Sequence, residues 1–230
     1  MIGAMAQTTE ERPSQTRPGG GRGVMFWAGV ALLAAGLVVL GYVAWQFFGT
    51  TVVSQREQQR IVEQTRRAWT ERTPAAKLRG AEALVRVPRF GRDYVVPVQK
   101  GVSTEVLAKG FGHFRGTAAP GQVGNYALAG HRVTHGEPLR RMPELRPGDK
   151  VVVETRNRVH TYRLDTDPND LVVTFNDIWV IDEVPQNPRG GVEPAQRPGQ
   201  RLLTLTTCSE LFHTDNRMIA FGHLVGTRRR

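Results

Sequence analysis

The sequence predicts an all-β domain, a closed or nearly closed barrel of eight strands with a few short helices, preceded by one N-terminal membrane helix and a helical stalk. Three observations lead to this prediction. Residues 24–48 carry no charge, residues 52–72 mix charged residues with sparse apolar ones, and after residue 82 short β-rich runs alternate with turn residues. A length of 230 residues allows one domain of ordinary size with extensions.

The N-terminal helix is predicted from its length and its flanking aromatic residues. Residues 24–45 form an apolar run of 22 residues, which as a helix spans about 33 Å and crosses a hydrocarbon core of ~30 Å. Trp27 near one end, and Tyr42 and Trp45 near the other, suit the two membrane interfaces. Cleaved signal peptides have shorter apolar regions and a small-residue cleavage site. We therefore predict an uncleaved signal anchor over residues 24–48.

The segments around this anchor predict how the chain is organised. Residues 1–23, rich in Pro, Gly and Thr, are expected to form a disordered tail, and residues 49–82 a polar membrane-proximal stalk or linker without a specific partner. Residues 83–227 are expected to form the barrel, and residues 228–230 a basic tail. Basic residues flank the anchor on both sides, so their distribution does not set the orientation. We expect the simplest topology, with the short tail inside the cell and the barrel outside.

The barrel is predicted from eight runs of β-forming residues bounded by turn residues. A closed barrel leaves no long exposed strand edge. We expect strands at residues 83–87, 94–99, 126–130, 150–155, 159–165, 179–184, 201–208 and 217–225, and short helices at residues 103–109 and 138–145.

Charge and cysteine content exclude several classes of protein. The net charge is +10, but residues 83–227 hold 18 basic and 15 acidic residues, so they lack the one-sided basic run of a nucleic-acid-binding surface. The single cysteine excludes a disulfide framework and a cysteine-rich zinc ribbon. No phosphate-binding, dinucleotide-binding or calcium-loop motif is present. We predict no metal and no cofactor.

The cysteine itself is the first candidate for chemistry. Cys208 ends the alternating run RLLTLTTC and precedes a polar loop, where a side chain is accessible to a substrate. The pattern leaves three interpretations open, namely a nucleophile, a small buried apolar residue and a metal ligand.

A thiol nucleophile needs a base and a donor for the oxyanion. Among six histidines, His131 stands out because it follows the strand run NYALA at a strand-to-loop position. Arg217 opens the strand after Cys208, and a strand–loop–strand connection would return it toward the thiol, although an ordinary surface arginine fits the pattern as well. Four of the others, His113, His135, His160 and His213, are expected at the surface.

Three motifs in this order resemble the sortase family, the membrane-anchored cysteine transpeptidases of Gram-positive bacteria. They are GNYALAGHR at residues 124–132, TLTTC at residues 204–208, and an arginine nine residues after the cysteine. The resemblance covers residues 83–227. The tyrosine of NYALAGHR, the DTDPND loop and the ending LTLTTCSELF are most similar to the class E branch of actinobacteria.

This resemblance implies an eight-stranded sortase barrel and a role for each site residue. Cys208 would be the nucleophile, His131 the acid and base, and Arg217 the oxyanion donor. Thr207 would bind the substrate by adding a hydrogen bond beside that of Arg217, and Tyr126 would contribute to a preference for LAxTG over LPxTG. Tyr126 and His131 are five residues apart and would point to opposite faces of a regular strand, so both reach one groove only if a bulge or the strand end intervenes.

The resemblance also implies substrates, partners and location. The enzyme would cleave a C-terminal LAxTG- or LPxTG-like sorting signal between Thr and Gly through a thioacyl intermediate, and transfer the surface protein to a lipid II-type peptidoglycan-precursor amine. Alternatives are a pilin-polymerising sortase, an anchored cysteine peptidase that uses water, and a non-catalytic wall-binding barrel. The expected location is the plasma membrane, single-pass, with a cytoplasmic N-terminus and an extracellular catalytic domain.

Overall fold

The computed structural model describes residues 21–45, 49–71, 80–208 and 215–230, and the chain divides into two compact units at residue 44. The first unit contains helix α1 (Gly21–Ala44), in which residues 23–43 are long and apolar enough to cross a membrane. Its apolar side chains are exposed all round the helix, for example Leu32, Leu33 and Leu37. An isolated helix that is apolar on every side is typical of a membrane span.

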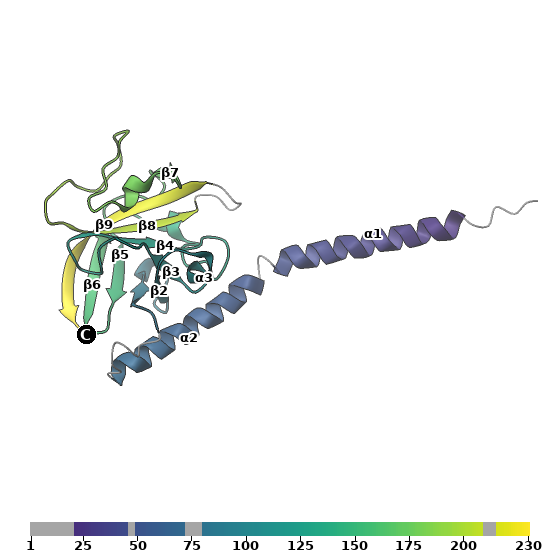
Figure 1. Cartoon of the computed structure of the whole chain (residues 1–230), viewed down its shortest axis with the longest axis horizontal. Helices are drawn as coiled ribbons and strands as arrows, with labels where there is room; N and C mark the ends of the chain where they lie inside the picture. The colour runs from purple at the N-terminus through teal and green to yellow at the C-terminus, as the bar shows by residue number, and fades with distance from the viewer. Residues whose placement is uncertain (1–20, 46–48, 72–79, 209–214) are drawn as a thin grey trace, which may run out of the picture. The chain divides into compact units, whose positions relative to one another are not determined.

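The second unit holds a β-barrel and helix α2 (Thr50–Thr70) (Figure 1). The strands are β1 (Ala83–Arg86), β2 (Val96–Lys100), β3 (Phe111–His113), β4 (Gly124–Ala129), β5 (Lys150–Glu154), β6 (Arg158–Leu164), β7 (Val172–Thr174), β8 (Arg201–Cys208) and β9 (Asn216–Arg229). One α-helical turn, α3 (Thr104–Leu107), and three 3-10 turns, η3 (Pro88–Phe90), η4 (Met142–Glu144) and η5 (Ile178–Ile181), lie between them.

Eight of the described strands close into a ring, so the predicted barrel is confirmed. The order is β6-β5-β1-β2-β3-β4-β8-β9, and the pairing of β6 with β9 closes it. The pairs β2–β3 and β4–β8 are parallel, whereas the others are antiparallel. Strand β9 is long enough for two partners on one edge, β7 along residues 216–218 and β6 along residues 222–229. Strand β7 is therefore an addition outside the ring.

Several predicted elements differ from the structure. The strand expected at residues 179–184 is wrong, because these residues begin in η5, where Trp179 and Val180 are buried against Ile219 and Phe221. A short apolar run does not distinguish a strand from a buried helical turn. Strands β3 and β7, three residues each, were not predicted.

The ends of other elements also shift. The helix expected at residues 103–109 is present as α3, and the one at residues 138–145 is reduced to η4. Residues 228–230 are not a free basic tail, since Arg228 and Arg229 pair with β6 and the Arg230 N–H donates to the carbonyl of Asn157.

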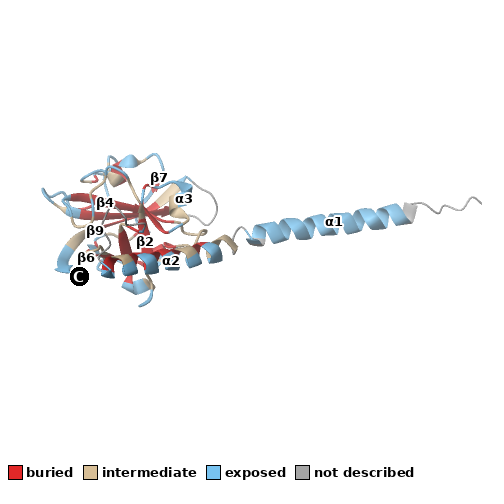
Figure 2. Ribbon diagram, turned by 60° about the horizontal axis from the view of Figure 1, so that its bottom comes forward, coloured by how far each residue is buried: buried red, intermediate tan, exposed pale blue. Residues whose placement is uncertain are grey.

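The interior of the barrel is formed by alternate residues of its strands, as the two-residue period of a strand requires. In β4 these are Tyr126 and Leu128, and in β8 they are Leu203 and Leu205, all fully buried in one apolar cluster. Figure 2 shows this buried layer along β4. Tyr162 lies in the same cluster; burial raises its pKa to about 12, and its hydroxyl accepts a hydrogen bond from the Gly121 N–H at 2.7 Å.

Helix α2 packs against the barrel, so the expectation of a solvated stalk without a partner is wrong for residues 50–70. Its buried side chains Ile61, Val62 and Trp69 form a cluster with Ala81 and Leu84. The side chains of β1 alternate between two faces. The residues on either side of Leu84 are buried inside the barrel, whereas Leu84 itself is buried under α2. The helix therefore covers apolar surface that would otherwise face water.

We predict that Trp69→Ala lowers the free energy of unfolding of the full chain by about 3 kcal/mol, because it removes a buried indole from the contact between α2 and the barrel. Chemical denaturation in detergent would measure the change. Gln64→Ala, at an exposed position of the same helix, is the control. Equal effects of the two substitutions would contradict the packing of α2.

Candidate active site

Cys208 lies at the end of β8, partly exposed, and the strand register sets its neighbour. In the antiparallel pair β8–β9, Cys208 is directly opposite Arg217, which itself is opposite Val173 of β7. The guanidinium of Arg217 donates to the carbonyl of Asn216 at 2.9 Å. The connection therefore returns an arginine to the cysteine, as the sequence predicts, through a directly paired strand.

The parallel pairing of β4 with β8 brings His131 to the same place. Ala129 is the last paired residue of β4 and lies opposite Thr206. Beyond it, the Gly130 N–H donates to the Thr206 carbonyl at 3.1 Å, and the Thr207 hydroxyl donates to the Gly130 carbonyl at 2.8 Å. Both backbone groups of the residue before His131 are thus held by the two residues before Cys208.

Position 130 is also tightly packed against the barrel. A Cβ atom at this position would lie 3.1 Å from the ring of Phe111 and 3.2 Å from Pro138. Such contacts are tighter than ordinary van der Waals packing. The His131 carbonyl accepts a hydrogen bond from the Leu139 N–H at 3.0 Å, which closes the histidine loop over residues 131–139.

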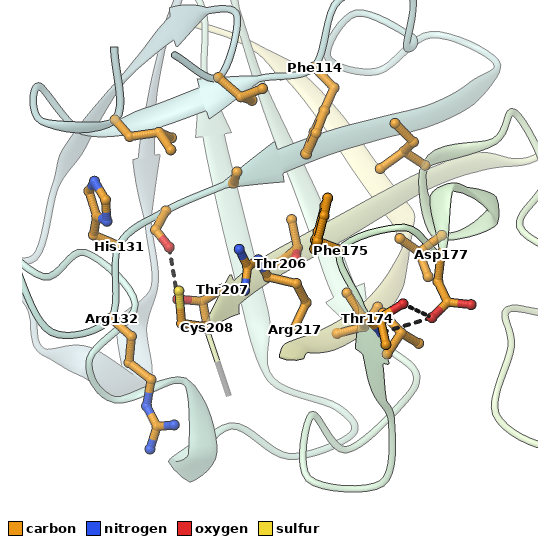
Figure 3. A pocket seen from close by; sticks show the side chains of 18 of the residues that line it. Phe114, His131, Arg132, Thr174, Phe175, Asp177, Thr206, Thr207, Cys208 and Arg217 are labelled. Carbon is orange, nitrogen blue, oxygen red and sulfur yellow. Dashed lines mark hydrogen bonds between the residues drawn. The ribbon is translucent and has the colours of Figure 1, made fainter. Parts of the chain in front are cut away.

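A groove of about 900 Å³ is lined by His131, Cys208 and Arg217 together. In Figure 3, Cys208 lies between His131 and Arg217. Most of the apolar lining comes from residues in and around α3 (Val102, Leu107, Phe114) and from the segment from β7 through η5 (Val173, Phe175, Ile178, Val180, Ile181). Residues 132–135 of the histidine loop also line the groove. The site is thus a reactive group at one part of an extended, largely apolar groove, which suits a peptide with apolar side chains.

The wall formed by β7 and η5 is held by Asp177. Its carboxylate accepts hydrogen bonds from the Thr174 N–H and hydroxyl, at 2.7 and 2.8 Å, and pairs with Arg189 at 3.0 Å. These bonds, from Thr174 first, lower the pKa of Asp177. Arg189 belongs to the long connection between η5 and β8, so the ion pair fixes that connection to the groove wall. Sequence reasoning missed Asp177.

Among the described residues no three His, Cys, Asp or Glu side chains gather as a metal-ligand set.

Comparison with known proteins agrees with this geometry. The sortase domain model matches residues 85–225, more than half of the chain. The chain belongs to the sortase family. The sortase SrtE1 of Streptomyces coelicolor is 34% identical over 213 residues, which is 88% of this chain and 57% of that protein. The sortase SrtE2 of the same organism is 25% identical over 98% of this chain and 95% of its own length.

Solved sortase structures share the barrel. Sortase E from Streptomyces avermitilis is 41% identical, with a TM-score of 0.56 over 65% of this chain and 90% of that one. Sortase E1 from S. coelicolor, solved with a tripeptide in its active site, is 34% identical, with a TM-score of 0.56 over 65% and 91%. The predicted resemblance to class E sortases is therefore confirmed, while the chain spans little more than half the length of SrtE1.

One sequence-predicted residue of this sortase does not line the groove. Strand β4 is regular, so Tyr126 points into the barrel together with Leu128, whereas Ala129 lines the groove on the outer face. Tyr126 is fully buried, and its hydroxyl donates to Glu82 at 3.4 Å. Burial, and then the Glu82 carboxylate, raises its pKa. This placement does not support the expected hydrogen bond from Tyr126 to a bound peptide.

The expectation of surface positions for His113, His135, His160 and His213 is wrong for the first and the third. His113 is largely buried, with Nδ1 at 2.7 Å from Glu82 and Nε2 at 3.1 Å from the Ala118 carbonyl. His160 is buried beside Thr227, and burial lowers its pKa. His223 is partly exposed next to Asp165, and His213 lies outside the described residues.

His135 is partly exposed and lies in the groove. Its ring stacks on that of His131, with centroids 4.9 Å apart and planes inclined by 28°. The signal in the sequence was the spacing His-x-x-x-His over residues 131–135, which places both rings in one loop.

We predict that Thr207→Val slows acylation of this sortase about tenfold, because the histidine loop loses its side-chain tether to β8 and small displacements of reacting groups are costly. The buried carbonyl left without its donor should also lower the free energy of unfolding by about 1–3 kcal/mol. Single-turnover kinetics and denaturation would measure both effects. Thr207→Ser keeps the hydroxyl and serves as the control; a valine variant as fast as the serine variant would exclude this role.

Proposed function

We propose that this sortase is a transpeptidase that cuts a C-terminal sorting signal and joins the upstream part to an amine. The observation that carries the proposal is the register of β4, β8 and β9, which places a thiol, an imidazole and a guanidinium along one groove. A relative of the same class holds a tripeptide in its active site, which supports a peptide substrate.

In the first half-reaction the Cys208 thiolate attacks the carbonyl carbon of the Thr residue before the cut. A carbon–sulfur bond forms and the Thr–Gly carbon–nitrogen bond breaks, which leaves a thioester on the enzyme. His131, as imidazolium, gives a proton to the departing glycine amine. The partial exposure of Cys208 at a strand end leaves the sulfur accessible to the peptide.

Arg217 stabilises the negative charge that develops on the carbonyl oxygen. An arginine guanidinium is a cation that presents several N–H donors in one plane. Because Arg217 lies directly across the strand pair from Cys208, its charge is near the carbon that the sulfur attacks. An oxyanion donor of this kind contributes most when it is fixed before the reaction begins.

In the second half-reaction an amine attacks the thioester carbon. Neutral His131 accepts the proton of the amine, the new amide bond forms, and Cys208 leaves as thiolate. We propose a peptidoglycan-precursor amine of the lipid II type as the acceptor. A pilin lysine would give a polymerising enzyme and water would give a peptidase, with the same residues in the same roles.

The apolar groove supports a signal of the LAxTG or LPxTG type. Residues with apolar side chains line both walls, including Leu107 and Phe114 on one and Ile178 and Ile181 on the other. A leucine at the start of the signal would bury its side chain there, with Thr held at Cys208. We place the enzyme in the plasma membrane by α1, with its N-terminus cytoplasmic and the barrel outside.

We expect the purified full chain in detergent, mixed with a sorting-signal peptide, to form a covalent adduct on Cys208 that mass spectrometry detects and maps. Cys208→Ala should form no adduct and no product while its thermal unfolding midpoint stays near that of the parent, because the chain holds one cysteine. Turnover in Cys208→Ala would disprove the mechanism. Ligated product on addition of an amine identifies the transferase, and hydrolysis unaffected by the amine identifies a peptidase.

Arg217→Lys should reduce kcat by a factor on the order of 10²–10³, although it preserves the charge, because lysine cannot reproduce the planar donor fork. Steady-state kinetics with the same peptide measures this loss. Arg197→Lys, at an exposed position of the connection before β8, is the matched control and should change kcat little. A near-normal kcat in Arg217→Lys would assign the residue to the architecture of the strand pair.

The proposed topology predicts the outcome of proteolysis on intact, wall-stripped cells that make this chain. External protease should remove the barrel and spare residues 1–23, which an antibody against an N-terminal tag would detect. A cytoplasmic marker protein must remain intact in the same sample. Protection of residues 83 onward would reverse the orientation.

A further inference from the structure

Helix α2 contacts the loop that carries His131 as well as the barrel. Gln58 of α2 is 5% exposed, and its Nε2 donates to the carbonyl of His135 at 3.1 Å. The hydroxyl of Thr51, two turns earlier, donates to the Glu137 carboxylate at 3.3 Å. Burying a side-chain amide costs free energy unless the amide makes its hydrogen bonds. The bond from Gln58 therefore favours the one position of the loop in which the His135 carbonyl accepts it.

The backbone of this loop is held in a conformation that it would not adopt alone. His135, Gly136 and Glu137 all have positive φ, at 53°, 82° and 50°. Two of them are not glycine, and such residues persist in this region only when their surroundings hold them. Gly136 lies so close to α2 that a Cβ atom there would meet the Gln58 amide nitrogen at 2.5 Å.

The ring of His135 transmits this constraint to His131. The two rings stack 4.9 Å apart, and Nδ1 of His135 lies 3.0 Å from the Thr134 hydroxyl, which fixes the orientation of the His135 ring. One contact chain therefore runs from the Gln58 amide through the backbone and ring of His135 to the His131 ring. The other side of His131 is held at Gly130 by β8.

We propose that Gln58 and His135 are positioning residues for His131, and that the membrane-proximal helix is thereby part of the catalytic apparatus. This inference rests on the proposed role of His131 as acid and base. An imidazole that first gives and then accepts a proton has to keep one position through two half-reactions. The contacts at Gly130 and at the His135 ring hold His131 in that position. Gln58 itself does not line the groove, so the effect of its substitution falls on the chemical step.

The first test compares two neighbouring glutamines of α2 in the full chain. Gln58→Ala and Gln58→Glu both remove the amide donor, and Glu keeps the length of the side chain. We expect each to lower the acylation rate constant about tenfold, with KM within about twofold of the parent. Gln59→Ala, at an exposed position, should leave both unchanged. Parent-like rates in both Gln58 variants would overturn the inference.

The second test separates stacking from proton chemistry at His135. His135→Phe keeps a flat ring, so we expect acylation within about threefold of the parent, whereas His135→Ala should lose about tenfold. If Phe is as slow as Ala, stacking is not the function of His135 and the inference is overturned at this residue.

Two further measurements separate this inference from simpler explanations. The amplitude of acyl-enzyme formation counts folded active sites, so a loss of amplitude at an unchanged rate constant would mean that Gln58 serves folding only and would overturn the proposal. His131→Ala tests the role on which the inference rests. Full activity in His131→Ala removes the acid–base mechanism itself, whereas an inactive His131→Ala beside parent-like Gln58 variants removes only the role of α2.

Discussion

The site depends on one pair of hydrogen bonds at Gly130. Its N–H is bonded to the Thr206 carbonyl and its carbonyl to the Thr207 hydroxyl, so the end of β4 is fixed to the end of β8. These segments are 77 residues apart in the chain, and only the parallel pairing of their strands makes them neighbours. Cys208 and His131 follow directly on the two sides of this junction. Because strand pairing fixes the backbone just before both residues, the sheet holds the thiol and the imidazole in defined positions.

Side chains along the same strands alternate between the apolar interior, which stabilises the fold, and the outer face, which forms the site. In β8, Leu203 and Leu205 fill the barrel, while Thr204 and Thr206 face outward with Cys208. Thr204 bonds outward to Asn125 and to the carbonyl of Val180, which attaches η5 to the sheet. A two-residue period thus buries apolar surface on one face and builds a groove wall on the other. Substitutions in the groove leave the apolar interior intact, so they can change rate without removing the fold.

The sequence predicted the parts of this protein that depend on local pattern and missed those that depend on contacts between distant segments. Alternation over residues 201–208 placed β8 and Cys208, and the motifs shared with sortases located His131 and Arg217. The strand expected at residues 179–184 failed because η5 is buried against the outer side of β9, which no local pattern reveals. Tyr126 was assigned to the groove although its odd separation from His131 already argued for the inner face, and the regular strand β4 places it there.

Helix α2 shows how far the folded unit extends beyond the part that motifs define. The sortase match begins at residue 85, yet residues from 44 onward belong to the same compact unit as the barrel. The guanidinium of Arg230 lies over the ring of Trp69 of α2, 4.8 Å from the ring centroid. The apolar neighbours of Trp69 cover Leu84 of β1. The beginning and the end of the unit therefore meet on one outer face of the barrel. In the sequence, a polar helix with a few apolar residues resembles a solvated spacer. Its partner Leu84 lies in a strand whose other residues face inward, so the local pattern does not reveal the contact. The helix that leads away from the membrane anchor is thus integral to the fold that holds the active site.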